Sequence, residues 1–166
     1  MVTKLKSLYR FLSGKHQTVH LDYKVDAKPR FPKEGHPQLY AIIDANRAEY
    51  AATLSSFLNF SEQIQSIKKL SEESDENQPA WNNDFLPGLD IVGIYGIIAT
   101  KKPKKYIEIG SGNSTKVARK AIEDQKLSTE IISIDPYPRA NIDHLSDKVI
   151  RKPFENLEDI SFIVEE

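Results

Sequence analysis

The chain of 166 residues contains no cysteine, one methionine and one tryptophan, and its formal net charge at pH 7 is −1. The lack of cysteine excludes disulfide bonds and cysteine-rich zinc sites. The near-zero charge gives no overall attraction to nucleic acid. No apolar run approaches the roughly 20 residues that cross a bilayer, and internal repeats are absent. The expectation is a soluble cytoplasmic protein, long enough to bury a sizeable core.

An apolar run that ends in two closely spaced glycines is the most informative part of the sequence. Residues 106–109 form a short, partly β-branched run that is apolar except for Glu108, as expected of a buried parallel strand. Gly110 and Gly112 permit backbone angles that a Cβ forbids, and they let a ligand approach the main chain. Asn113 or Ser114 can cap the first turn of a following helix.

The downstream sequence completes a βαβ unit. Apolar residues recur at helical spacing within 117–122, with charged residues between and around them. A second apolar run, 130–135, ends in Asp135. Ligands of doubly wound sheets bind beyond the carboxyl ends of the strands, so Gly110 and Asp135 are expected at one crevice that holds a nucleoside.

The identity of that nucleoside can be argued from charge. Dinucleotide sites use three glycines, and Thr115 occupies the third position here. Glu108 adds a carboxylate at the expected mouth, which would repel a pyrophosphate and attract a cationic ligand. These residues favour S-adenosylmethionine over NAD.

The pattern Glu108-x-Gly110-x-Gly112-x-Ser114 with Asp135 resembles the first two motifs of class I S-adenosylmethionine-dependent methyltransferases. The stretches 81–90 and 133–139 look like a bacterial subgroup of that superfamily. The resemblance covers roughly residues 30 to 155, with strong motifs only between 106 and 138. It implies an α/β fold with a Rossmann-like doubly wound parallel sheet, and methyl transfer to a small-molecule acceptor.

The resemblance also implies roles for particular residues. Glu108 would orient the amino group of the cofactor's methionine part, directly or through a water. Gly110, Ser111 and Gly112 would line its carboxypropyl and ribose region with backbone groups. Asp135 would accept hydrogen bonds from both ribose hydroxyls.

Further contacts are implied at the edge of this site. Pro136 and Tyr137 would lie against the sugar or adenine, and Phe154 would lie where such enzymes contact the adenine. Asn83 and Asp84 would lie beside the cofactor, although a helix entrance at Pro87 explains the same stretch. The expected cofactor contacts are Asn83, Asp84, Glu108, Gly110, Ser111, Gly112, Asn113, Ser114, Asp135, Pro136, Tyr137 and Phe154.

Only three strands can be counted from Lys104 to Glu166, whereas the superfamily's sheet has seven. We therefore expect a shortened product or a fragment of a longer enzyme. Two alternatives stay open: a non-catalytic binding or interaction protein, and a nicotinamide-dependent oxidoreductase. No catalytic base can be assigned, and a homo-oligomer is left open.

The N-terminal part is predicted to be helical. The first 14 residues carry an apolar helical stripe, which fits a terminal helix or a membrane-surface anchor. A connector at 22–37 precedes a long helix at 38–60, broken near Asn46. His16 and His20 are four residues apart, but Thr18-Val19 favours extended chain, so we expect no metal site.

A shorter helix at 61–70, capped by Ser61, precedes the acidic linker 72–77. We divide the chain near residue 78 into a helical extension, 1–78, and a nucleoside-binding domain, 79–166. Residues 89–99 are predicted to form a buried helix in which Gly93 and Gly96 permit close packing. The lysines of 101–105 are read as a solvated loop without nucleic-acid contact.

Overall fold

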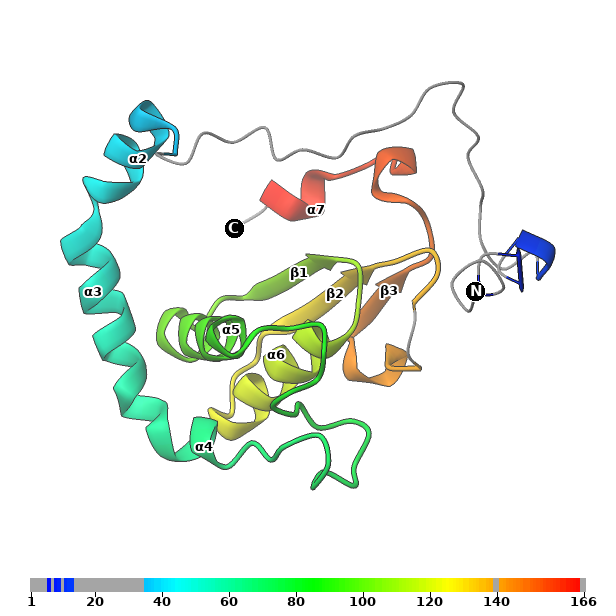
Figure 1. Ribbon diagram of the computed structural model, residues 1–166, viewed down its shortest axis with the longest axis horizontal. Helices are drawn as coiled ribbons and strands as arrows, with labels where there is room; N and C mark the ends of the chain where they lie inside the picture. Colours follow the sequence, from blue (N-terminus) through cyan, green and yellow to red (C-terminus); the bar gives the residue numbers. More distant parts are fainter. Residues whose placement is uncertain (1–5, 7, 10, 14–34, 139–140, 165–166) are drawn as a thin grey trace. The chain divides into compact units, whose positions relative to one another are not determined.

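The computed structural model describes residues 6, 8–9, 11–13, 35–138 and 141–164 (Figure 1). The chain divides into two compact units, Met1–Ile43 and Asp44–Glu166. The predicted division near residue 78 falls inside the second unit. The two histidines considered as metal ligands and residues 22–34 of the predicted connector lie outside the described residues.

The predicted break in the long helix is confirmed. Two residues separate helix α2 (Pro37–Asp44) from α3 (Arg47–Ser56), and the second of them, Asn46, stands at the N-cap of α3. The 3₁₀ helix η1 (Phe57–Phe60) follows directly, and α4 (Ser61–Gln65) is shorter than predicted. Ser61 is the first residue of α4 rather than its cap, because Phe60 holds that position.

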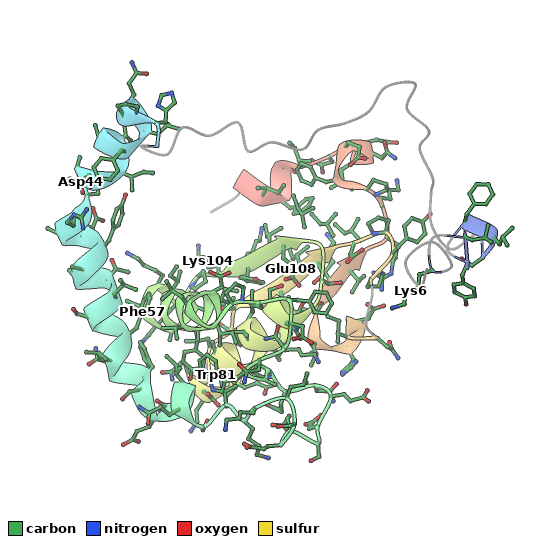
Figure 2. The ribbon with its side chains drawn as sticks, in the orientation of Figure 1. Lys6, Asp44, Phe57, Trp81, Lys104 and Glu108 are labelled. Atoms are coloured by element: carbon green, nitrogen blue, oxygen red, sulfur yellow. The ribbon has the colours of Figure 1, made fainter. Side chains whose placement is uncertain are left out.

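Helix α5 (Gly88–Lys101) forms where a buried helix is predicted at 89–99, but it is only partly buried, because Leu89 and Ile97 are exposed. Ile91 and Tyr95 are fully buried, and burial of one such side chain contributes about 1.5–3 kcal/mol. Gly96 packs against Phe57, since a Cβ built on Gly96 would lie 2.4 Å from the Phe57 ring. Figure 2 shows Phe57 beside α5. Gly93 has no such neighbour, so only one of the two predicted close approaches is present.

Three parallel strands form the sheet, in the order β1-β2-β3. They are β1 (Lys105–Ile109), β2 (Glu130–Ile134) and β3 (Lys148–Ile150). Helix α6 (Asn113–Asp124) connects the first two strands as predicted. The predicted third strand, 148–152, stops at Ile150. The α/β class is confirmed as a small parallel sheet with several helices.

Helices α5 and α6 pack side by side on one face of the sheet (Figure 1). Side chains alternate along a strand, and Tyr106 and Ile131 point from neighbouring strands into the core under these helices. Val117, Ala118 and Ala121 of α6 are fully buried there, as the apolar stripe predicts.

Short elements complete the second unit. They are η2 (Asp143–Leu145), η3 (Phe154–Asn156) and α7 (Ser161–Val164). Helix α7 lies over the face of the sheet opposite α5 and α6 (Figure 1), where the Lys148 ammonium stands 5.2 Å from the centre of the Phe162 ring. None of the helices within the described ranges combines the length and apolarity needed to cross a membrane.

Candidate functional site

A cavity of about 670 Å³ opens at the carboxyl ends of β1 and β2. This volume lies within the range of small-molecule and cofactor sites. The loop between β1 and α6 forms one part of its wall, and the residues that follow β2 form another. The lining residues are Phe85, Gly110, Ser111, Gly112, Asn113, Lys116, Asp135 and Tyr137.

The two glycines of the loop differ in backbone conformation. Gly110 has φ +84°, a left-handed conformation that side chains rarely adopt, whereas Gly112 has φ 173° and is extended. A Cβ at Gly112 would meet no protein atom within 4 Å. Close packing within the protein therefore does not explain a glycine at 112, and the space beside it is open to a ligand.

The backbone N–H groups of the glycine loop form hydrogen bonds within the protein. The Gly110 N–H donates to the Ile134 carbonyl at 2.9 Å, and the Ser111 N–H donates to the Asp135 carboxylate at 2.8 Å. The Gly112 N–H donates to the Thr115 hydroxyl at 3.0 Å. Three consecutive N–H groups are thus already paired, which leaves them unavailable to an anion.

Asp135 joins the ends of the two strands. Its Oδ2 accepts the Ser111 N–H and, at 3.1 Å, the Ser111 hydroxyl, while Oδ1 accepts the Tyr137 N–H at 2.9 Å. Burial alone would raise the pKa of Asp135, but these hydrogen bonds and the nearby Arg151 charge hold it below its ordinary value. Asp135 is therefore a carboxylate at neutral pH.

Glu108 does not lie where we predicted it. Its side chain is buried and does not line the cavity. It accepts hydrogen bonds from Ser114 at 2.9 Å, from Ser133 at 2.8 Å, from Tyr106 at 3.5 Å and from Thr115.

A carboxylate offers about four acceptor positions, and these four hydroxyls occupy them. Burial, together with the Glu108 charge, also raises the pKa of Tyr106, so its hydroxyl remains a donor. Glu108 therefore anchors the loop to the sheet and does not line the cavity.

The predicted cap of α6 needs correction. The N-cap residue is Gly112, and neither Asn113 nor Ser114 caps the helix. The Ser114 hydroxyl turns down to Glu108, and the Thr115 hydroxyl takes the Gly112 N–H instead. A buried acceptor under the helix start thus competes successfully for the Ser114 hydroxyl.

The stretch before α5 is tied to the loop through Asn83. Its side chain is buried, accepts the N–H groups of Phe85 and Leu86, and donates to the Ala80 carbonyl. It also accepts from the Asn113 amide at 3.0 Å. Asn83 therefore shapes the turn and positions Asn113, while the neighbouring Phe85 ring reaches the cavity.

Half of the predicted contacts line the cavity and half do not. Gly110, Ser111, Gly112, Asn113, Asp135 and Tyr137 line it. Asn83, Asp84, Glu108, Ser114, Pro136 and Phe154 do not. Asp84 is exposed in a turn with φ 66°, and Phe154 begins η3.

Two lining residues, Phe85 and Lys116, were not predicted. Lys116 could have been found, because it follows Asn113 by three residues and therefore shares its helix face. Phe85 lies in a stretch that we connected with the site, but nothing in its spacing singles it out.

No group of three or more histidine, aspartate or glutamate side chains in the described part of the chain is arranged for a metal ion. Comparison of the chain with family models, curated proteins and solved structures gives no match.

Proposed function

We propose that this chain is a cytoplasmic, class I-type S-adenosylmethionine-dependent methyltransferase with a Rossmann-like domain, acting on a small-molecule acceptor. One observation carries the proposal. The glycine loop after β1 and Asp135 after β2 line a single cavity at the carboxyl ends of adjacent parallel strands. This is where such sheets bind nucleosides, and a carboxylate after the second strand suits a ribose diol.

The backbone of the loop favours this cofactor over a dinucleotide. A pyrophosphate binds to free N–H groups at a glycine loop and helix start. Here the N–H groups of Gly110, Ser111 and Gly112 are paired within the protein. The Glu108 charge, which we expected at the mouth of the site, does not contribute to this preference, because the carboxylate is buried and hydrogen-bonded to hydroxyl groups.

S-Adenosylmethionine, when bound, supplies an electrophilic methyl group for in-line attack by an acceptor atom. The contribution of the chain would be to hold cofactor and acceptor aligned, which is worth up to roughly 7–11 kcal/mol. Asp135 would fix the ribose, and Gly112 would admit the ligand against the backbone. Phe85 and Tyr137, which are 73% and 88% exposed, would cover apolar ligand surface at the rim.

The test is a calorimetric titration of S-adenosylhomocysteine into the wild type, Asp135→Ala and Gly110→Val. We expect Asp135→Ala to weaken binding roughly tenfold or more, because hydrogen bonds to a charged group contribute about 1.5–3 kcal/mol. Gly110→Val should bind weakly because a β-branched residue cannot hold φ +84° without strain.

Asp159→Ala is the matched control. In the wild type, the Asp159 carboxylate also accepts the N–H group two residues ahead, from Ser161 at 2.8 Å, but Asp159 does not line the cavity. The Asp159→Ala variant should bind S-adenosylhomocysteine with the affinity of the wild type. Equal affinity in Asp135→Ala, Gly110→Val and the wild type would remove the site assignment.

A further inference from the structure

Helix α6 carries three cationic side chains, and their partners differ. Arg119 pairs with Asp147 at 2.8 Å, and Lys120 pairs with Asp124 at 3.1 Å. Lys116 forms no ion pair with any of the described residues. It is also the one of the three that lines the candidate site.

The cavity therefore has two charged lining residues of opposite sign. Asp135 follows β2, and Lys116 lies in the first turns of α6, with the loop Gly110–Asn113 between them in the sequence. The Asp135 charge is already balanced by hydrogen bonds and by Arg151, whose guanidinium donates to the Asp135 carbonyl at 2.8 Å. An unpaired ammonium in a ligand-sized cavity suits an anionic group on the ligand.

We propose that the Lys116 ammonium binds the carboxylate of the cofactor's amino-acid part. This inference rests on the proposed function. S-Adenosylmethionine carries the ribose diol on one side of its sulfonium sulfur and the amino-acid carboxylate on the other. Asp135 takes the first and Lys116 takes the second, so that the site selects the complete amino-acid nucleoside over adenosine fragments.

Lys116 also borders a second cavity, of about 210 Å³, whose lining includes Glu73, Asp75 and Glu76. Two of these acids are already engaged. Glu73 pairs with Lys68 at 3.8 Å and accepts the Asp75 N–H, and Asp75 accepts the Asn77 N–H. A purely structural lysine that holds this acidic segment would change stability without changing ligand preference, which separates the two roles.

The experiment compares two ligands that differ in one group. S-Adenosylhomocysteine has the carboxylate, and its decarboxylated form keeps the adenosine, sulfur and amine. Each is titrated calorimetrically into the full chain as wild type, Lys116→Met and Lys120→Met. Methionine keeps the length and apolar stem of lysine and removes the charge.

For the wild type we expect roughly tenfold tighter binding of S-adenosylhomocysteine than of the decarboxylated ligand, as one charged hydrogen bond provides. Lys116→Met should abolish this preference and leave the affinity for the decarboxylated ligand within about twofold. Lys120→Met, one turn further along α6, should keep the preference. Added salt should reduce the preference in the wild type.

The outcomes are distinguishable. If neither ligand binds the wild type, the proposed function fails and this inference fails with it. If both ligands bind and Lys116→Met retains the preference, the inference alone is overturned. Equal weakening of both ligands by Lys116→Met, with a lowered melting temperature, would also overturn it in favour of a structural role.

Discussion

Replacing each loop glycine by alanine should separate the demands of the fold from those of the ligand. Gly110 has φ +84°, and a left-handed alanine costs roughly 1–2 kcal/mol, partly offset by the reduced freedom of the unfolded chain. We expect Gly110→Ala to lower the free energy of unfolding by about 1 kcal/mol, which lowers the melting temperature by roughly 2–4 °C.

Gly112→Ala should behave differently, although it is the same chemical change two residues away. Gly112 is extended, and a Cβ there meets no protein atom within 4 Å. The free energy of unfolding should stay within about 0.5 kcal/mol of the wild-type value. The added methyl group should nevertheless weaken S-adenosylhomocysteine binding, because it stands where the ligand approaches the backbone.

Urea unfolding measures the stability of both variants, and calorimetry measures the affinity of Gly112→Ala. If Gly112→Ala loses as much stability as Gly110→Ala, the described loop geometry is wrong. If Gly112→Ala is stable and binds the ligand as the wild type does, the backbone at 112 is not part of the site.

Three further predictions concern packing, competition for Asp135 and pH. Gly96→Ala should destabilise the chain by about 1–3 kcal/mol in urea unfolding, because its Cβ would force the Phe57 ring off α5; an unchanged midpoint would contradict this packing. Ser111→Ala should bind S-adenosylhomocysteine as tightly as the wild type or up to about fivefold tighter, since the Ser111 hydroxyl competes with the ribose for Asp135 Oδ2; a tenfold loss of affinity would instead make that hydroxyl a ligand contact. The pKa of Asp135 is lower in the folded chain than the ordinary aspartate value of about 3.9, so the ionised side chain stabilises the fold fully at pH values above 3.9. This stabilisation is lost as the pH falls through the pKa that Asp135 has in the folded chain. Asp135→Asn should therefore show a smaller loss of stability between pH 5 and 2 than the wild type, and an identical pH profile would contradict the shift.

Local patterns in the sequence predict the βαβ unit well. The apolar run of β1, the helical stripe of α6 and the apolar run of β2 each lie within a few residues, so their periodicity is visible without knowledge of contacts. The break between α2 and α3 was predictable for the same reason.

Contacts between distant residues were not predictable in this way. The role of Glu108 depends on Ser133, 25 residues ahead, which turns an expected ligand contact into a buried anchor. The role of Asn83 depends on a hydrogen bond to Asn113, 30 residues ahead. The spacing of residues within one element does not reveal which hydroxyls or amides will surround a polar side chain from another element.

The end of the third strand also depends on such contacts. Arg151 directly follows β3, and its guanidinium donates to the Asp135 carbonyl and pairs with Asp143. These interactions link the residue after β3 to the segment that follows β2, beside the candidate site. The apolar pattern of the strand contains no sign of them.

The most direct test of the account is the ligand preference of the unmodified chain. Calorimetric titrations of S-adenosylhomocysteine and of NAD should be run under identical conditions. Because the loop N–H groups are paired internally and Asp135 is ionised, we expect saturable binding of S-adenosylhomocysteine and weaker or no binding of NAD. Tighter binding of NAD, or no binding of S-adenosylhomocysteine, would contradict the proposed function.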